Sequence, residues 1–188
     1  MSTAAGPPDL PAPRTPGRYH VAVVCLGNIC RSPIAGVVLR DRVAGAGLAD
    51  VVTVTSGGTG GWHVGGEMDA RAAATLDAAG YDADDVAGHR ARQYDAGWAA
   101  EADLVLAMDA GNLAEVRRRA EAAGTAEPGR LRLFRDLDDV DPGADVPDPY
   151  YGGDDGFEEV LGMVERTADR LVAALPDALD GDRSGGRA

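Results

Sequence analysis

Four short apolar runs alternate along the chain with longer stretches in which apolar residues recur at helical spacing. The short runs are rich in β-branched residues and predict buried strands at 19–24, 51–55, 104–108 and 131–134. The longer stretches predict helices at 33–44, 69–79, 109–123 and 157–175, the third capped by Asp109, with a short helical turn around Trp98. Strands that alternate with helices are typical of an α/β fold, so we expect a single four-stranded parallel sheet with helices on both faces.

The two ends of the chain lack this pattern. Residues 1–18 are rich in Pro and nearly free of large apolar side chains, and residues 176–188 are rich in Asp, Gly and Arg. We therefore expect a disordered leader at 1–18, one folded domain at 19–175 and a disordered tail at 176–188. A chain of 188 residues is long enough for one such domain to bury most of its apolar surface.

Composition limits the partners of the chain. The formal net charge is −13, which disfavours nucleic acid and anionic membranes as partners. No apolar run approaches the roughly 18 residues that span a bilayer, and no apolar signal segment precedes the first strand, so we expect a cytoplasmic protein with a monomer as the default state. Two Cys and three scattered His predict neither a disulfide framework nor a metal site, and we expect no cofactor.

The candidate chemistry lies between the first strand and the first helix. Cys25 ends the apolar run, Arg31 follows in a tight loop, and Ser32 with Pro33 forms a typical helix start, Ser as the N-cap and Pro at the first helical position. A strand, a loop and a helix N-terminus in this order form an anion site, because loop N–H groups and the helix dipole face the same point. Arg31 adds a planar fork suited to phosphate oxygens.

A thiol beside an arginine at a helix N-terminus ionises more readily than an ordinary cysteine. Cys25 would then attack the bound phosphate as a thiolate, which indicates phosphoryl transfer to sulfur. In an isolated pattern, Cys25 would more often be a buried strand end and Arg31 a surface charge. The preceding strand, Gly27 and Asn28 in the loop, and the helix start favour the catalytic interpretation.

The segment from Cys25 to Pro33 resembles the active-site loop of low-molecular-weight protein tyrosine phosphatases, and the downstream run Asp148-Pro149-Tyr150-Tyr151 resembles a second motif of that family. The resemblance extends over about residues 19–175. It implies a phosphocysteine intermediate on Cys25, phosphate binding by Arg31 and the loop amides, and a metal-free reaction on phosphotyrosine proteins. The leaving group needs a proton from an acid. Because many Asp residues lie in predicted loops, only the resemblance selects Asp148.

The resemblance also assigns the residues around the phosphate. It implies a substrate-binding loop of Leu26, Gly27, Asn28, Ile29, Cys30 and Ser32. The Ser32 hydroxyl would donate to Cys25, a role that competes with capping the helix. Asn28 would adopt a positive φ, which Asn tolerates better than most residues.

Further roles come from the same resemblance. Ser56 and His89 would support Asn28, although a loop Ser and a solvated His are the simpler interpretations. Cys30 would form a protective disulfide with Cys25 under oxidation, or serve as a small buried apolar residue. Aromatic walls suited to an aryl group would be formed by Trp62, Tyr150 and Tyr151.

Three other functions share parts of this pattern. In protein arginine phosphatases the position of Ile29 tends to be Thr and the acid loop lacks the paired Tyr, so Ile29 and Tyr150-Tyr151 favour phosphotyrosine. An arsenate reductase of this fold needs a further resolving Cys, and the chain has none after Cys30. A non-catalytic phosphate-binding module would be favoured if Cys25, Arg31 or Asp148 were replaced.

Overall fold

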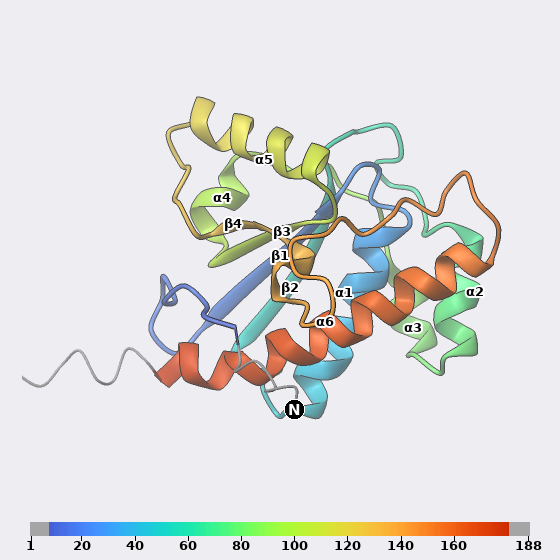
Figure 1. Cartoon of the computed structure of the whole chain (residues 1–188), viewed down its shortest axis with the longest axis horizontal. Coiled ribbons are helices and arrows are strands. Elements are labelled where there is room, and N and C mark those ends of the chain that lie inside the picture. The colour runs from blue at the N-terminus through green and yellow to red at the C-terminus, as the bar shows by residue number, and fades with distance from the viewer. Residues whose placement is uncertain (1–7, 181–188) are drawn as a thin grey trace, which may run out of the picture.

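The computed structural model describes residues 8–180 and shows one four-stranded sheet with the order β2-β1-β3-β4 (Figure 1). The strands are β1 Tyr19–Cys25, β2 Val52–Gly58, β3 Leu104–Ala107 and β4 Leu131–Leu133. Every neighbouring pair is parallel, and Cys25 lies opposite Gly58 in the register of β1 with β2. The predicted parallel α/β sheet is confirmed, and its carboxyl edge brings the ends of β1, β2 and β3 together.

Helices cover both faces of the sheet. They are α1 Arg31–Gly45, α2 Ala70–Ala78, α3 Ala83–Gly88, α4 Gly97–Glu101, α5 Ala110–Ala122 and α6 Asp155–Asp180, with a 3₁₀ turn η1 at Phe134–Leu137. Helices α1 and α6 pack on one face, and α4 and α5 lie on the other (Figure 1). The sequence pattern missed α3, a short helix capped by Asp82. Within residues 8–180, no helix is both long and apolar enough to cross a membrane.

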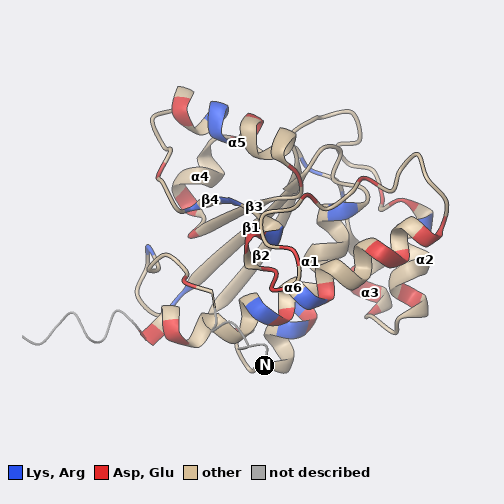
Figure 2. Cartoon of the chain, in the orientation of Figure 1, with Lys and Arg blue, Asp and Glu red and all other residues tan. Residues whose placement is uncertain are grey.

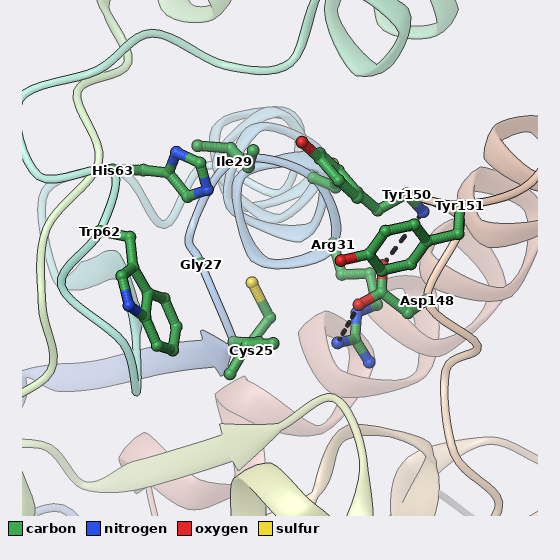
Figure 3. Close-up of a pocket in the computed structure, with 11 residues that line it drawn as sticks. Cys25, Gly27, Ile29, Arg31, Trp62, His63, Asp148, Tyr150 and Tyr151 are labelled. Atoms are coloured by element: carbon green, nitrogen blue, oxygen red, sulfur yellow. Dashed lines mark hydrogen bonds and ion pairs between the residues drawn. The ribbon is translucent and has the colours of Figure 1, made fainter.

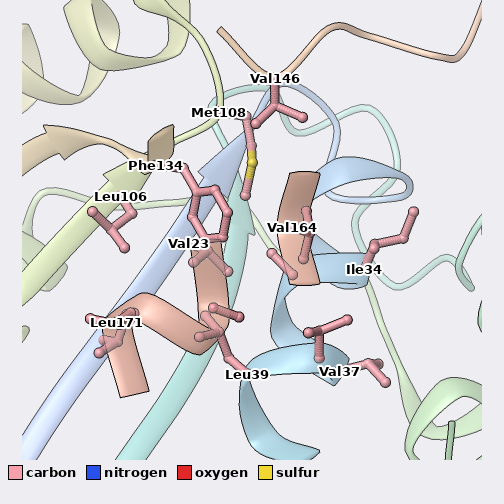
Figure 4. Close-up of a cluster of buried hydrophobic side chains, with 14 of the residues drawn as sticks. Val23, Ile34, Val37, Leu39, Leu106, Met108, Phe134, Val146, Val164 and Leu171 are labelled. Carbon is pink, nitrogen blue, oxygen red and sulfur yellow. The ribbon is translucent and has the colours of Figure 1, made fainter. Parts of the chain in front are cut away.

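Alternation along β1 divides the interior into two cores. Val21, Val23 and Cys25 face α1 and α6, whereas Ala22 and Val24 face α4 and α5. The larger core is filled by aliphatic and aromatic side chains from the sheet, both helices and η1 (Figure 4). Each fully buried side chain of this kind contributes about 1.5–3 kcal/mol. Cys25, at the end of β1, is therefore positioned by the close-packed side chains of the larger core.

The leader differs from the prediction. Residues 8–18 lie against the amino end of the sheet, where the Arg14 guanidinium donates to the carbonyls of Ala99 and Ala102, each at 2.9 Å. Tyr19 Oη donates to Pro11 O at 3.1 Å. The structure places these residues, contrary to the expected disorder, through polar contacts and through Leu10, which packs against the larger core. Residues 1–7 lie outside the described part.

The last helix also differs from the prediction. We expected it to end before Pro176, but α6 continues through this residue to Asp180. A proline inside a helix removes one hydrogen bond and crowds the preceding turn. Ala178 and Leu179 nevertheless pack against the larger core, and this burial offsets that cost. The predicted tail is thus helical at 176–180, and 181–188 lie outside the described residues.

A buried ion network anchors the loop between η1 and α6, which carries many acidic residues (Figure 2). Asp138 accepts from Arg135 Nε at 2.9 Å and from Arg166 Nε and Nη2 at 2.8 Å each. The Asp138 side chain is fully buried. Hydrogen bonds from Arg166, followed by those from Val140 N and Arg135, hold the pKa of Asp138 well below its usual range, against the opposing effect of burial.

Replacing Asp138 with Asn is expected to lower the free energy of unfolding at neutral pH by about 3 kcal/mol, because it removes the buried carboxylate and leaves Arg135 only the more distant Asp141 carboxylate at 3.5 Å. A depressed folded-state pKa stabilises the protein above the unfolded value, near 3.9, and this contribution is lost as pH falls below it. The difference between wild type and Asp138→Asn in urea unfolding should therefore shrink toward low pH. The exposed neighbour Asp139→Asn serves as the control, and an equal loss in both variants would contradict the anchoring role.

Candidate active site

One cavity opens at the carboxyl edge of the sheet. It has a volume of about 320 Å³ and is lined by residues of the loop after β1, the Gly-rich loop after β2 and the segment before α6. The Cys25 sulfur points into it between two groups of side chains, Trp62 with His63 on one side and Asp148, Tyr150 and Tyr151 on the other (Figure 3). The structure thus brings both sequence motifs into one site.

Cys25 is held at the base of the cavity with only 3% of its surface exposed. Its Sγ lies 3.0 Å from Ser32 Oγ and accepts from Asn28 N at 3.2 Å. Ser32 Oγ in turn accepts from Asn28 Nδ2 at 2.9 Å, so the hydroxyl hydrogen is available for Cys25 or for Gly57 O at 3.2 Å. These donors can stabilise negative charge on the sulfur.

The predicted N-cap role of Ser32 is wrong. Helix α1 begins at Arg31, with Cys30 at the cap position and no side-chain capping bond. Ser32 lies inside the first turn, and its hydroxyl is directed to the Cys25 sulfur and Asn28 instead. The Ser32 hydroxyl therefore lies beside the Cys25 sulfur, at 3.0 Å, as the family resemblance implied.

Asn28 adopts the expected positive φ, at 57°, and is fully buried. Its side chain donates to Ser56 Oγ at 3.0 Å and accepts from Arg92 N at 2.9 Å. Its carbonyl oxygen lies 2.8 Å from His89 Nε2. These contacts over-determine a backbone conformation that non-glycine residues rarely adopt.

His89 contacts Asn28 as a neutral donor. Burial lowers the pKa of this histidine, and the opposing contribution of the hydrogen bond to Asn28 O is smaller. Because a carbonyl only accepts, Nε2 carries the proton in this contact. Ser56 and His89 therefore contact Asn28 at the places expected of supporting residues.

The Arg31 guanidinium is 3% exposed and bridges two acidic side chains. Nη1 donates to Asp109 Oδ2 at 2.7 Å and to Val146 O at 3.0 Å, and Nη2 donates to Asp148 Oδ2 at 3.1 Å. The first carboxylate follows β3, and the second lies in the segment before α6. Arg31 is thereby fixed in position with Asp148 beside it.

Asp148 is placed by its own segment. Val146 N donates to Met108 O at 2.7 Å, which fixes this segment against the end of β3. Pro147 and Pro149 flank Asp148 and restrict the backbone on both sides. Tyr150 N donates to Asp148 Oδ1 at 3.1 Å, so one carboxyl oxygen contacts the backbone and the other contacts Arg31.

The chain was compared with known families, curated proteins and solved structures. The profile of the family described as low molecular weight phosphotyrosine protein phosphatase matches residues 20–180. The chain belongs to this family.

The chain also matches individual members of the family over most of their length. A low molecular weight protein-tyrosine-phosphatase of Streptomyces coelicolor is 48% identical over 165 residues, 87% of this chain and 97% of the relative. The low molecular weight protein-tyrosine phosphatase A of Mycobacterium tuberculosis is 43% identical, over 78% of this chain and 85% of the relative. The crystal structure of YfkJ from Bacillus subtilis has a TM-score of 0.76 at 34% identity and covers 85% of this chain and 96% of that one. The chain is accordingly a protein-tyrosine phosphatase, a phosphoric monoester hydrolase.

Aromatic side chains flank the mouth of the phosphatase cavity. Trp62 lies so close to Gly60 that a Cβ at this position would approach its ring to 1.8 Å, so a larger residue there would displace the ring. Gly60 N donates to Leu26 O at 2.8 Å, which ties the loop of Trp62 to the loop of Cys25. On the other side of the mouth, the rings of Tyr150 and Tyr151 pack edge to face, with 5.0 Å between their centroids.

Cys30 lies in the same loop as the proposed nucleophile and is buried. Burial first, and then the charges of Asp69, Cys25 and Asp148, raise the pKa of Cys30 to about 12. The Cys30 sulfur therefore stays a protonated thiol at neutral pH. A protonated thiol is a weak nucleophile, which leaves Cys25 as the candidate nucleophile of the loop.

Two site residues of the phosphatase were not predicted as such. Asp109 was expected only to cap α5, and it does accept from Asn112 N at 2.7 Å, but its second oxygen binds Arg31. Its place directly after β3, on the same sheet edge as Cys25, was a usable signal. His63 lines the cavity beside Gly27, where a Cβ would meet its ring at 3.0 Å. No spacing in the sequence indicates this contact.

Proposed function

We propose that the chain hydrolyses phosphotyrosine in proteins through a phosphocysteine intermediate on Cys25, with Arg31 binding the phosphate and Asp148 acting as general acid and then base. The observation that carries this proposal is the convergence of the three side chains on one cavity, with Sγ supported by Ser32 Oγ at 3.0 Å and Arg31 in contact with Asp148 at 3.1 Å.

In the first step the Cys25 thiolate attacks phosphorus opposite the tyrosine oxygen. An S–P bond forms, the P–O bond to the ring breaks, and the proton of Asp148 passes to the leaving oxygen. Charge develops on the equatorial phosphate oxygens, where the loop amides and Arg31 stabilise it. Asn28, Ser56 and His89 contribute by keeping the loop in its positive-φ conformation.

In the second step water replaces sulfur on phosphorus. The Asp148 carboxylate accepts a proton from the attacking water, the S–P bond breaks, and the electron pair returns to Cys25. The hydroxyl of Ser32 then donates to the sulfur as its negative charge reappears. Both steps use the same groups in opposite protonation states, and the enzyme returns to its starting form.

The depth of the site supports a preference for phosphotyrosine. Cys25 is almost fully buried, while Trp62, Tyr150 and Tyr151 flank the mouth above it. A substrate must therefore place its phosphorus beyond an aromatic entrance, which a long, flat aryl side chain can do and a short serine side chain cannot. Rings of this kind add favourable offset or edge contacts with an aryl group.

The direct test is hydrolysis of three peptides that differ only in carrying phosphotyrosine, phosphoserine or phosphoarginine. We expect kcat/KM to be highest for phosphotyrosine, because only this residue fills the aromatic entrance. A higher value for phosphoarginine would assign the chain to the arginine-specific branch. Binding of all three without hydrolysis would indicate a phosphate-binding module.

Oxidation provides a separate prediction. Peroxide is expected to convert the Cys25 thiolate to a sulfenic acid, which the Cys30 thiol attacks with loss of water to form a disulfide that added thiol reduces. Because the pKa of Cys30 is about 12, ring closure should accelerate as pH rises from 7 to 9. Recovery of activity after peroxide and then thiol should be full in wild type and incomplete in Cys30→Ser. Equal recovery would show that Cys30 does not protect Cys25.

A further inference from the structure

Exposed large apolar side chains gather around the mouth of the active site. Among the described residues, those with substantial exposure are Leu26, Trp62, Val64, Tyr150, Tyr151 and Val140. All but Val140 belong to the three loops that form the cavity. Isolated exposed apolar residues are ordinary, but a cluster beside a binding cavity marks an interaction surface. We call these five residues the apolar collar.

Part of the collar extends beyond the reach of one phosphotyrosine ring. Tyr151 is 93% exposed, Trp62 74% and Val64 60%, so a large accessible apolar surface surrounds the mouth, although Trp62 and Tyr151 also line the cavity. Val64 does not line the cavity but lies in the turn of Trp62 and His63, where Val64 N approaches Gly61 O at 3.4 Å. This accessible surface is available to the residues on either side of the phosphotyrosine.

The tyrosine side of the collar is held by neighbouring side chains. Trp62 rests on Gly60, as described above. The Arg71 guanidinium lies 5.5 Å from the centroid of the Tyr150 ring and donates to Tyr150 O at 3.1 Å. Apolar groups that are already ordered lose little entropy when a peptide covers them, so their burial contributes to affinity.

The charges near the mouth disfavour acidic peptides. The protein has a net charge of −13, and the Asp148 side chain, which lines the cavity, is 37% exposed. The nearby cations are paired, Arg31 with Asp109 and Asp148, and Arg71 with Asp69. An acidic flank would approach like charge without a free cation among these groups to receive it.

We propose that this phosphatase selects phosphotyrosine flanked by large apolar residues over phosphotyrosine flanked by acidic residues, with the apolar collar as the specificity-determining surface. The proposal rests on the proposed function, because it concerns the substrates of the same site. The occupant of the collar is a phosphopeptide that places an aliphatic or aromatic side chain within two residues of its phosphotyrosine. The position of the collar, continuous with the phosphate cavity, favours this occupant over any partner that binds elsewhere.

The test compares three phosphotyrosine peptides of one length whose flanking residues are Leu, Ser or Glu. We expect kcat/KM for the Leu peptide to exceed that for the Ser peptide about five- to tenfold, because a partly covered side chain gains a fraction of its full burial free energy. At low salt, kcat/KM for the Glu peptide should be lower than for the Ser peptide. The difference between these two values should become smaller at high salt, because salt screens the repulsion between charges. Equal values, or a preference for Glu, would overturn the proposal.

Variants connect the preference to the collar. The Leu-to-Ser ratio of kcat/KM, measured within one variant, cancels any general change in activity. Val64→Ser with Tyr151→Ser should bring this ratio close to 1, whereas Val140→Ser, which removes the exposed apolar residue outside the collar, should leave it unchanged. A ratio that stays high in the collar double variant would contradict the proposal.

Two further outcomes separate this inference from other accounts. If no phosphotyrosine peptide is hydrolysed, the proposed function fails, whereas hydrolysis without flank preference overturns only the collar. Sedimentation at the assay concentration detects the other occupant, a second copy of the chain. The wild-type protein could form a dimer that the Val64→Ser and Tyr151→Ser double variant does not form. If kcat/KM is also equal for the three peptides, the collar serves self-association instead.

Discussion

Replacing Cys25 with serine is expected to abolish phosphatase turnover, with kcat lowered by on the order of 10⁴-fold or more. A serine hydroxyl is only weakly nucleophilic without an adjacent base, and the groups that contact Sγ are donors, Asn28 N at 3.2 Å and the hydroxyl of Ser32. The substitution changes one buried atom, so the fold and phosphate binding should be retained. Initial rates on an aryl phosphate and thermal unfolding of the same samples check both parts.

Ser56→Ala is a suitable control for this substitution. It removes one hydrogen bond to Asn28 Nδ2 and leaves the thiol in place. We expect it to retain a measurable fraction of wild-type turnover, because Ser32, Arg92 and His89 still hold Asn28. Near-wild-type turnover in pure Cys25→Ser would exclude a cysteine nucleophile.

Asp148→Asn is expected to lower kcat/KM on phosphotyrosine, which reports formation of the phosphocysteine, by roughly 10²–10⁴-fold. A phenol with a pKa near 10 needs a proton to leave, whereas an activated nitrophenol-type group needs it less. The loss on an activated aryl phosphate should therefore be much smaller. The ratio of the two losses is the diagnostic quantity, because a change in pocket shape alone would affect both substrates alike.

The control for this second prediction is Asp154→Asn, an exposed acid before α6, which should leave both rates near wild type. If Asp148→Asn lowers both rates equally, another carboxylate must supply the proton. Asp145 is then the next residue to replace, although its Oδ1 already accepts from Ala110 N at 2.9 Å.

The sheet could be predicted because its strands carry strong local signals. The β-branched run before Cys25 and the alternation of short apolar runs with helical periods predicted a parallel sheet, and the structure places Cys25 and Ser56 toward the carboxyl edge of that sheet. The boundaries that failed depend on tertiary contacts. Pro176 indicates a helix end locally, but packing of Leu179 carries α6 past it. Arg14 orders part of the leader through carbonyls distant in sequence.

The site was predictable where a motif was contiguous. The loop of Cys25 and Arg31 lies between a strand and a helix start, which by itself predicts an anion site with a nucleophile. Asp148 is one of many carboxylates in predicted loops, and only the family resemblance selects it. Asp109 was missed because a helix cap explained it fully, although one carboxylate has two oxygens and can serve two partners. The helix cap, the alternative role weighed for Ser32, is contradicted because Cys25 and Asn28 contact its hydroxyl instead.

The proposed mechanism requires that phosphate is transferred from the substrate to the sulfur of Cys25. Rapid quenching of Asp148→Asn during turnover of an activated aryl phosphate, followed by mass spectrometry of the digested protein, tests it most directly, because this variant lacks the base for the second step and should accumulate the intermediate. We predict a phosphate on the peptide that contains Cys25, at the cysteine itself, and none in Asp148→Asn combined with Cys25→Ser. Turnover that leaves Cys25 unmodified, or a phosphate on Cys30 or His63 instead, would contradict the account.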